Sequence, residues 1–522
     1  MRTQLHADPA GVSLHNAILD ACRRFGERPA VVDTSGVAPA RLTYADYGLR
    51  VESVARGLVA AGLRPGEVLA IYLSNSWEFA ITYHAATLAG GIPTLLNPSY
   101  REREVRYQLE NSGAVLLITD GPFIKDMNLS GLPALRRVYL TRTGTGGEAF
   151  YALMRPSTAT LPALTEPADK ALAALPYSSG TTGLPKGVML THTNLVANCY
   201  QYLAPGERAT YQAGEVVLDF LPLYHIYGLN VVLSPTLIIG GTLVMMPRFD
   251  LDRCLDLIAQ EGVTFLPMVP PVLNAFCHAA EQGRFPRDSR VRAGKSGAAP
   301  LAPELPRRFT ELTGIPIRQG YGMTEASPVT HMGYTEPDLY RPESIGPPLA
   351  QTDCRLVSEA GADLPPGQPG ELVMRGPQFM LGYWKNAQAT AEVLRDGWFW
   401  SGDVAARDAQ DFYFILDRRK EMIKYKGFPI APAEVEAVLL EHPAVRDCGV
   451  VPLPDRAAGE IPCAFIVLRD GGPGSSKLGE ELSAFVAERL TTYKQPREVR
   501  FVASIPRNPS GKILRRNLRD LL

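Results

Sequence analysis

A segment between residues 177 and 187 combines residue types suited to holding phosphates. It reads Tyr-Ser-Ser-Gly-Thr-Thr-Gly-Leu-Pro-Lys-Gly, with four Ser/Thr hydroxyls, three glycines and one lysine. Glycine lets backbone N–H groups approach a polyanion closely, while the hydroxyls and Lys186 can donate to its oxygens. The Walker A pattern requires Ser or Thr after the lysine, whereas Gly187 stands there. The segment predicts a different phosphate loop, although a surface turn would be the better interpretation if it stood alone.

A second segment, residues 319–325, reads Gln-Gly-Tyr-Gly-Met-Thr-Glu. Its glycines would let a flat ligand lie against the backbone. Thr324 could bond a phosphate, and Glu325 could hold a divalent cation that bridges phosphate oxygens. A glycine turn with a solvated glutamate is an equal interpretation of this segment by itself. Together the two segments favour a nucleotide triphosphate as a substrate.

Three weaker signals lie further along the chain. Asp403 follows the aromatic run Trp398–Trp400 and could accept both hydroxyls of a ribose, or it could be a local cap. Lys424 opens a Lys-Tyr-Lys-Gly stretch that could equally be surface charge. Lys512 ends a turn rich in Pro and Gly, residues 506–512, where a solvated lysine is as good an interpretation.

The elements that must position these residues belong to a long, charge-balanced chain. Its 522 residues carry 53 basic and 54 acidic side chains, without long blocks of one sign. The length predicts several structural units, and the charge balance argues against nucleic acid as a partner. A multidomain enzyme is the expectation. No coiled-coil heptads are evident, and the oligomeric state stays open.

The cysteines and the ends of the chain bear on location. The seven cysteines lie far apart, without a CxxC motif, which argues against a disulfide framework and a zinc site. They are expected to be mostly buried thiols in a reducing cytoplasm. No signal core or peroxisomal address is evident at the ends. The most apolar run, 229–246, is interrupted by Asn230, Pro235 and two glycines, so it is expected to form core elements and not a membrane span.

Short apolar runs alternate with amphipathic stretches, as where the strand-like Val68–Leu73 precedes the helical Trp77–Leu88. This rhythm predicts an α/β fold. Around 347–374 the pattern changes to short strands and Gly/Pro turns, which predicts a small β-rich subdomain. A charged connection begins after the strand-like Phe412–Leu416. We therefore expect a large N-terminal domain of α/β subdomains plus the β-rich one, residues 1–417, and a smaller mobile α+β domain, residues 418–522.

In their order and spacing these segments resemble the adenylate-forming (AMP-binding) superfamily of acyl-CoA synthetases, luciferases and amino-acid adenylation domains. The resemblance runs from about Leu42 to Arg516 and includes a Gly382-Tyr383-Trp384 motif. Within the superfamily the chain is most similar to 4-coumarate and fatty acid CoA ligases, through the segments 221–228 (Leu-Pro-Leu-Tyr-His-Ile-Tyr-Gly) and 296–301 (Ser-Gly-Ala-Ala-Pro-Leu).

The resemblance implies an acid–thiol ligase with ATP and CoA as co-substrates and Mg²⁺ as cofactor. A carboxylate would attack the α-phosphate of ATP, and the CoA thiol would then displace AMP from the acyl-adenylate. Glu325 would bind Mg²⁺, Thr324 would contact the α-phosphate, and Asp403 would take the ribose hydroxyls with help from Arg418. The implied ATP-binding residues are Ser178, Ser179, Gly180, Thr181, Thr182, Gly183, Lys186, Gln319, Gly320, Tyr321, Gly322, Thr324, Asp403 and Arg418.

Family members rotate the C-terminal domain between the two half-reactions. Lys512 matches the lysine that bridges the carboxylate and the α-phosphate, in a context that looks like the acetylation target of some relatives. Lys420 matches the hinge position. The face used for thioester formation would carry Lys424, Lys426 and Gly427.

His225 resembles the aromatic gate between adenylate and thiol, although a lone histidine is often a satisfied core residue. The implied catalytic residues are Lys512, His225, Thr324 and Lys424. The resemblance also implies an apolar acyl pocket lined by Tyr227, Ala298, Ala299, Gly320, Gly322, Pro328 and Val329. Such a lining fits both a fatty acid and an aryl-propenoic acid. The expectation favours a medium- or long-chain fatty acid, with a 4-coumarate-like aromatic acid as the alternative.

Other functions are weighed against this one. An amino-acid adenylation domain usually places an acidic residue near the histidine motif, where this chain has Ile226 and Tyr227. Nothing specific indicates the oxygen chemistry of a luciferase. An enzyme with another acceptor than CoA stays open. A non-catalytic nucleotide sensor would tolerate loss of Lys512, Lys424 or Glu325, yet all of them are present.

Overall fold

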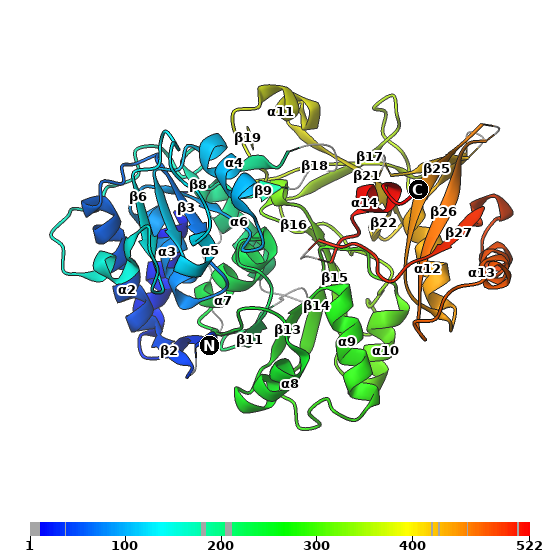
Figure 1. Ribbon diagram of the computed structural model, residues 1–522, viewed down its shortest axis with the longest axis horizontal. Helices are drawn as coiled ribbons and strands as arrows, with labels where there is room; N and C mark the ends of the chain where they lie inside the picture. Colours follow the sequence, from blue (N-terminus) through cyan, green and yellow to red (C-terminus); the bar gives the residue numbers. More distant parts are fainter. Residues whose placement is uncertain are drawn as a thin grey trace.

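The computed structural model describes residues 11–36, 38–178, 184–203, 211–418, 421–425, 428–456, 458–508 and 511–522. Figure 1 shows a large N-terminal part built around several sheets and a smaller C-terminal part, in orange and red, beside it. This arrangement confirms the expected α/β fold with a large domain followed by a smaller one.

The largest sheet has eight strands in the order β16-β15-β14-β13-β11-β12-β1-β2. Its central strands are parallel, and the edge strands β16 and β2 run antiparallel to their neighbours. Strands in parallel sheets are covered on both faces, which is why they are short apolar runs. In the same order the strands are Val329–Met332, Ile317–Gly322, Ala293–Ser296, Phe265–Met268, Val216–Asp219, Thr242–Met245, Pro29–Asp33 and Ala40–Thr43.

A second parallel sheet has the order β4-β3-β5-β6-β7. Figure 1 shows it in the blue to cyan part of the chain. Its strands are Ile92–Leu95, Val68–Tyr72, Leu116–Thr119, Arg137–Leu140 and Glu148–Ala149. The expected strand at Val68–Leu73 and helix at Trp77–Leu88 are confirmed as β3 and α3, within one residue.

Two antiparallel sheets complete the N-terminal part. In the first, β10 (Lys186–Thr191) pairs with β8 (Leu172–Ala174), β9 (Tyr177–Ser178) and β19 (Gly382–Tyr383). The second is the β-rich subdomain expected near residues 347–374. It contains β17 (Asp353–Val357), β18 (Gly370–Arg375), β20 (Leu394–Arg395), β21 (Trp398–Arg407) and β22 (Tyr413–Arg418).

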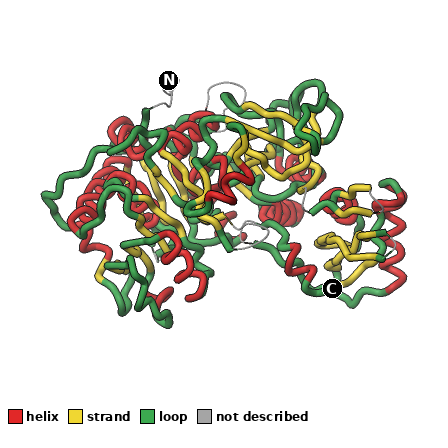
Figure 2. Tube along the Cα trace, turned by 90° about the horizontal axis from the view of Figure 1, so that it is seen from above, coloured by secondary structure: helices red, strands yellow, loops and turns green. Residues whose placement is uncertain are grey.

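The C-terminal part has its own sheet and its own hydrophobic clusters, drawn from residues 423–518. Figure 2 shows this sheet and its helices standing apart from the rest of the chain. Its strands are β23 (Ile423–Tyr425), β24 (Phe428–Ile430), β25 (Val445–Asp455), β26 (Gly459–Leu468) and β27 (Glu498–Phe501). The predicted boundary between residues 417 and 418 falls at the end of β22, and it stays a prediction.

The helices lie mainly between the strands and cover the sheets. Several begin at a serine that accepts a hydrogen bond from the first turn, as Ser13, Ser76 and Ser475 do. The α-helices are α1 (Leu14–Phe25), α2 (Tyr44–Ala60), α3 (Trp77–Leu88), α4 (Glu102–Ser112), α5 (Gly121–Ile124), α6 (His192–Leu203), α7 (Ser234–Ile238), α8 (Leu251–Gln260), α9 (Pro270–Glu281), α10 (Glu304–Thr313), α11 (Ala387–Val393), α12 (Pro432–Glu441), α13 (Ser476–Arg489) and α14 (Arg515–Arg519). Shorter helical turns are η1 (Phe150–Met154), η2 (Gly228–Leu233), η3 (Thr324–Ala326) and η4 (Thr492–Lys494).

The apolar run 229–246 is part of the core, as expected. It forms η2, α7 and β12, and all three are buried apart from Thr242 at the start of β12. None of the helices in the described ranges has the length and apolar character needed to cross a membrane. All seven cysteines are free thiols, and six of them are buried, with Cys354 partly exposed.

A cluster of buried histidines joins helices α1, α3 and α6. The rings of His15 and His192 lie 5.1 Å apart at right angles, and the Tyr47 hydroxyl is 2.8 Å from Nδ1 of His84. Burial lowers the pKa of His15 to about 4 and the pKa values of His84 and His192 to about 3. The folded protein therefore keeps these side chains neutral, whereas the unfolded chain protonates them near pH 6.5.

Acidification is expected to destabilise the fold through this cluster. Between pH 6.5 and about 4 the unfolded chain binds more protons, so stability is lost as the pH falls, by about 2 kcal/mol for each histidine at pH 5. Thermal unfolding at pH 7 and pH 5 measures this. The Leu14 N–H donates to His192 Nδ1, and His192→Asn keeps an acceptor for it. This substitution should reduce the pH dependence of the melting temperature. His278 of α9 lies outside this cluster, so His278→Gln provides the control and should leave the contribution of the cluster unchanged.

Candidate active site

The expected site residues gather at the carboxyl ends of the parallel strands of the largest sheet. Met268 of β13 pairs with Ser296 of β14, which pairs with Gln319 of β15. The segments at this edge are the histidine motif after β11, the Gly-Ala-Ala turn at 297–299 after β14, and the Gly-Tyr-Gly run at 320–322, which ends β15. Ligands of open α/β sheets bind in the crevice outside this edge. The structure therefore brings these separate sequence segments to one place.

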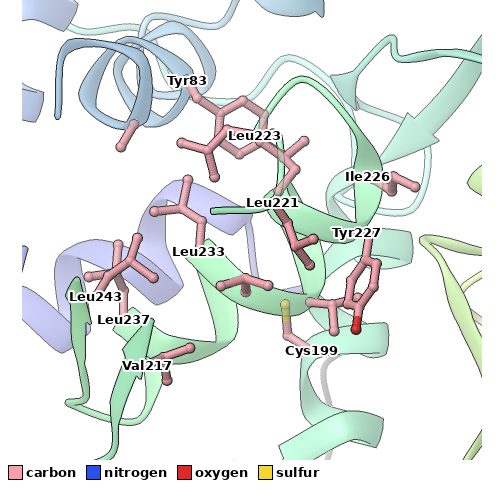
Figure 3. Close-up of a cluster of buried hydrophobic side chains, with 14 of the residues drawn as sticks. Tyr83, Cys199, Val217, Leu221, Leu223, Ile226, Tyr227, Leu233, Leu237 and Leu243 are labelled. Carbon is pink, nitrogen blue, oxygen red and sulfur yellow. The ribbon is translucent and has the colours of Figure 1, made fainter. Parts of the chain in front are cut away.

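The histidine motif turns sharply after β11 and packs into the core. Figure 3 shows Leu221, Leu223, Ile226 and Tyr227 among buried apolar side chains, with Leu223 beside Tyr83 of α3. The His225 imidazole accepts a hydrogen bond from the backbone N–H of Tyr227 at Nδ1, over 3.2 Å. Burial lowers the pKa of His225 to about 4, so the ring is neutral near pH 7. A neutral ring in a fixed orientation suits a gate better than a charged one.

Tyr227 and Gly320, both expected to line the acyl pocket, lie close to Gly297. The Tyr227 hydroxyl donates to the backbone oxygen of Met268 over 3.1 Å. A Cβ atom added to Gly320 would lie 2.5 Å from Cε of Lys295, and one added to Gly297 would lie 3.3 Å from the Gly320 oxygen. A side chain at 320 would therefore have to displace the end of the Lys295 side chain.

Ala298 and Gly322 shape the same region through the backbone. Ala298 has φ of 68°, an uncommon conformation for a residue with a side chain, of the kind that clusters at functional sites. A Cβ atom on Gly322 would lie 2.1 Å from the Pro328 oxygen. The adjacent Val329 is buried, and its N–H donates to the Asn198 side chain over 3.0 Å. The pocket residues expected from the family are thus neighbours in space.

Lys295 lies close to Tyr227 and Gly320, two expected pocket residues, and sequence reasoning missed it. It lies on β14, is only 2% exposed, and its ammonium is 4.4 Å from the ring centre of Tyr202 and 5.3 Å from that of Tyr227. Burial, followed by the nearby Arg318, holds the pKa of Lys295 well below its usual range. A lysine inside a strand of small and apolar residues is the signal that could have identified it, because lysine is almost never buried without a reason.

Two of the expected ATP-binding residues, Tyr321 and Asp403, contact each other. The Tyr321 hydroxyl donates to Oδ2 of Asp403, which is 5% exposed. Asp403 pairs with Arg418 across strands β21 and β22. The adjacent pairing of these two residues agrees with a shared role at a ribose. The side chain of Arg418 lies outside the described residues.

Glu325 and the phosphate hairpin meet at a second cluster. Strands β9 and β10, which flank the expected phosphate loop, pair Ser178 with Lys186. We call these two paired strands the phosphate hairpin. The Ser178 hydroxyl donates to Oε1 of Glu325 over 3.3 Å, and the Tyr383 hydroxyl donates to the same oxygen over 2.8 Å. Ser179, Gly180, Thr181, Thr182 and Gly183, expected to hold phosphates, lie outside the described residues.

The chemistry of this cluster fits Mg²⁺ bound together with ATP. Protein sites for Mg²⁺ commonly supply one or two carboxylates, with phosphate oxygens and waters completing the shell. Glu325 supplies such a carboxylate beside the phosphate hairpin. The described segments contain no group of three or more His, Cys, Asp or Glu side chains placed to hold a metal alone. A cation here would therefore depend on the nucleotide.

Lys512 reaches the large sheet from the C-terminal part. Its backbone N–H donates to the Asn508 side chain over 2.8 Å, which fixes the turn. A Cβ atom added to the preceding Gly511 would lie 3.2 Å from Pro271 and 3.8 Å from Val269, which follows β13. Figure 1 shows the red segment extending from the C-terminal part towards β15. Lys512 thus lies at the same edge of the sheet as the pocket.

The thioester residues are placed differently. Lys424 is exposed on β23, where its N–H donates to the Glu460 side chain over 2.8 Å. Both residues belong to the C-terminal sheet. Lys420, Lys426 and Gly427 lie outside the described residues. In this arrangement Lys512, not Lys424, is the lysine brought to the edge of the large sheet.

Comparisons with known proteins agree with this geometry. A family model described as "AMP-binding enzyme" matches residues 18–384, and one described as "AMP-binding enzyme C-terminal domain" matches residues 434–512. The chain is 38% identical to 4-coumarate–CoA ligase 5 of Oryza sativa subsp. japonica, covering 99% of this chain and 96% of the relative. It is also 38% identical to 4-coumarate–CoA ligase 1 of Narcissus pseudonarcissus, covering 98% and 94%.

Solved structures give the same picture. The anthranilate CoA ligase AuaEII in complex with anthranoyl-AMP matches with a TM-score of 0.89 and 25% identity, over 98% of each chain. The ATP-bound MatB from Rhodopseudomonas palustris matches with a TM-score of 0.87 and 28% identity, over 98% of this chain and 99% of the other.

Proposed function

Since the chain belongs to the family of AMP-binding enzymes, we propose that it joins an aromatic carboxylic acid to CoA through an acyl-adenylate. The enzyme is an acid–thiol ligase. The family membership expected from the sequence motifs is confirmed. The roles of individual residues below are part of the proposal.

In the first half-reaction a carboxylate oxygen attacks the α-phosphate of ATP, and pyrophosphate leaves. The attack brings two anions together, so cationic groups at the α-phosphate should dominate catalysis. Lys512 would bridge the carboxylate and the phosphate, Thr324 would contact the phosphate, and Lys186 with the hairpin would hold the leaving pyrophosphate. Mg²⁺ held by Glu325 would neutralise charge on the phosphates. Asp403 and Tyr321 would hold the ribose and adenine.

In the second half-reaction the thiol sulfur of CoA attacks the acyl carbonyl carbon, and AMP leaves as the acyl-phosphate bond breaks. His225 beside the pocket would act as the gate through which the thiol enters. Rotation of the C-terminal domain would bring Lys424, Lys426 and Gly427 to this position in place of Lys512. The exposed position of Lys424 on the C-terminal sheet is compatible with such a change.

The choice of acid rests on the buried amino group of Lys295. A fatty acid would bring methylene groups against this group and offer it no hydrogen-bond partner, which is unfavourable. An aromatic acid could offer a ring face or a phenolic oxygen to the same group. The names of the 4-coumarate–CoA ligases that match the chain support the aromatic alternative as well. We therefore favour an aryl-propenoic acid over the fatty acid expected from the sequence.

A panel of acids tests this choice. We expect ATP- and CoA-dependent thioester formation to be fastest with 4-coumarate and slower with cinnamate, benzoate and aliphatic acids of increasing length. Pyrophosphate release is measured in parallel. A maximum at an aliphatic acid would overturn the aromatic proposal. Pyrophosphate release without thioester would point to an acceptor other than CoA.

The hinge is tested by Lys420→Pro. Proline fixes φ and removes a backbone N–H, so it should restrict rotation of the C-terminal domain. We expect adenylate formation to be largely retained and thioester formation to slow by at least about tenfold, as for other enzymes limited by a conformational step. Single-turnover release of pyrophosphate and formation of thioester separate the two steps. Lys420→Ala is the control, and equal loss of both steps in Lys420→Pro would contradict the hinge assignment.

Seven free thiols fit a reducing compartment, and we retain the cytoplasm as the proposed location.

A further inference from the structure

The segment Gly382–Lys385 contains a Gly-Tyr-Trp motif to which the proposed mechanism gives no role. Its strand β19 runs antiparallel to β10, so Tyr383 pairs with Val188 and Gly382 with Met189. Strand β10 begins at Lys186, which is the last residue of the segment expected to hold phosphates. The motif is therefore attached directly to one arm of the phosphate hairpin.

Tyr383 contacts two residues of the expected phosphate site that are far apart in the sequence, Glu325 and Lys186. Its hydroxyl donates to Oε1 of Glu325 over 2.8 Å, and its ring centre lies 4.9 Å from the ammonium of Lys186. The side chain is 7% exposed. The N–H of Met380, just before the motif, also donates to the backbone oxygen of Glu325 over 2.9 Å. The segment thus fixes both the backbone and the carboxylate of Glu325.

Hydrogen bonds on the other side hold the segment in place. The backbone N–H of Trp384 donates to the backbone oxygen of Gly187 over 2.8 Å. The Trp384 indole and the Lys385 ammonium both donate to the backbone oxygen of Asn111, over 3.2 and 2.9 Å. Asn111 lies in the last turn of α4, where carbonyl groups need such donors. The Asn111 side chain in turn accepts from Tyr177 at the start of the hairpin over 2.6 Å. Helix α4 and the Gly-Tyr-Trp segment therefore brace the hairpin together.

We propose that Tyr383 is a positioning residue for ATP and its cation, acting through Glu325 and Lys186. Ser178 and Tyr383 donate to the same carboxylate oxygen, which orients the carboxylate so that its second oxygen is presented to a divalent cation. The aromatic ring holds the Lys186 ammonium by a cation–π contact and so limits the positions it can take beside the phosphates. The inference rests on the proposed function, because it assigns these two residues to the ATP site.

The two contacts can be separated by substitution. Tyr383→Phe keeps the ring under Lys186 and removes only the hydrogen bond to Glu325. We expect ATP binding in the presence of Mg²⁺ to weaken by about 10- to 100-fold, the effect of one hydrogen bond to a charged group. Binding with EDTA in place of Mg²⁺ should not change. Tyr383→Leu removes the ring as well, so it should weaken ATP binding under both conditions. Calorimetric titration with ATP, without any acid, measures all of these.

Tyr44→Phe is the control, since it removes a buried hydroxyl that donates to the backbone oxygen of Gly241 and contacts neither Glu325 nor Lys186. It should leave the ratio of ATP affinities with and without Mg²⁺ unchanged. If Tyr383→Phe folds with the wild-type melting temperature and also leaves this ratio unchanged, the positioning role is overturned. If Tyr383→Phe lowers the melting temperature and leaves the ratio unchanged, the hydroxyl is structural and the proposal again fails. Failure of the wild-type protein to bind ATP would instead overturn the proposed function.

Discussion

Lys512→Ala is expected to lower the rate of adenylate formation by about 10²- to 10³-fold or more, because one well-placed donor to developing negative charge contributes about 3–4 kcal/mol. The Lys512 turn lies against Pro271 at the edge of the large sheet, which is where the carboxylate and the α-phosphate would meet. ATP-dependent release of pyrophosphate in the presence of acid measures the rate. Thermal unfolding of the variant should stay close to that of the wild type, since the lysine is only half-buried.

The same variant distinguishes the two half-reactions. When it is supplied with a preformed acyl-adenylate and CoA, Lys512→Ala should form thioester at a nearly normal rate, because another face of the C-terminal domain would serve this step. Lys477→Ala, at an exposed lysine of α13, is the control and should change neither step. Near-normal pyrophosphate release by folded Lys512→Ala would remove Lys512 from the mechanism.

Lys295→Met should change the choice of acid. Methionine keeps an unbranched chain of similar length and removes the cation. We expect kcat/KM for 4-coumarate to fall by about 10- to 100-fold, since a hydrogen bond between a charged group and the substrate contributes about 1.5–3 kcal/mol. Cinnamate, which lacks the phenolic oxygen, should be affected much less. The comparison of kcat/KM for the two acids in both proteins is the measurement.

The stability of this variant provides an independent check. Burying an ammonium is costly, so Lys295→Met should leave the melting temperature unchanged or raise it. A protein that is equally stable but equally impaired with both acids would show that Lys295 does not read the phenolic oxygen. The pocket would then select by shape alone.

The parts of the site that lie in continuous segments could be predicted from the sequence. The phosphate loop is flanked by apolar segments, the strand at Val68 is a continuous apolar run, and Ser76 caps the helix that begins at Trp77. The motifs at Gln319 and Lys512 have residue types that match their chemistry. Local patterns and family resemblance were sufficient for these, because each feature depends on neighbours in the sequence.

Contacts between distant segments could not be predicted in this way. Tyr383 and Glu325 are 58 residues apart, and Ser178 and Glu325 are 147 residues apart, yet they share one carboxylate oxygen. Such contacts depend on which strands pair, and the pairing of β10 with β19 is not visible in either strand alone. Sequence reasoning therefore noted the Gly-Tyr-Trp motif without finding its purpose.

The expectation of a fatty acid as substrate shows a similar limit of prediction from sequence. The lining residues recognised from the motifs are apolar or small, and that composition suits an aliphatic chain as well as a ring. Lys295 lies just before the Ser-Gly-Ala-Ala motif and was passed over, because a single strand does not reveal which of its faces meets the ligand. Its ammonium between Tyr202 and Tyr227 changes the balance towards an aromatic acid.

The most direct measurement is the product balance of the purified enzyme with ATP, Mg²⁺, CoA and 4-coumarate. We predict one thioester, one AMP and one pyrophosphate for each acid consumed, with no product when ATP or CoA is left out. The proposed function would be contradicted if the enzyme binds ATP and turns over a different acid or acceptor but forms no thioester from 4-coumarate.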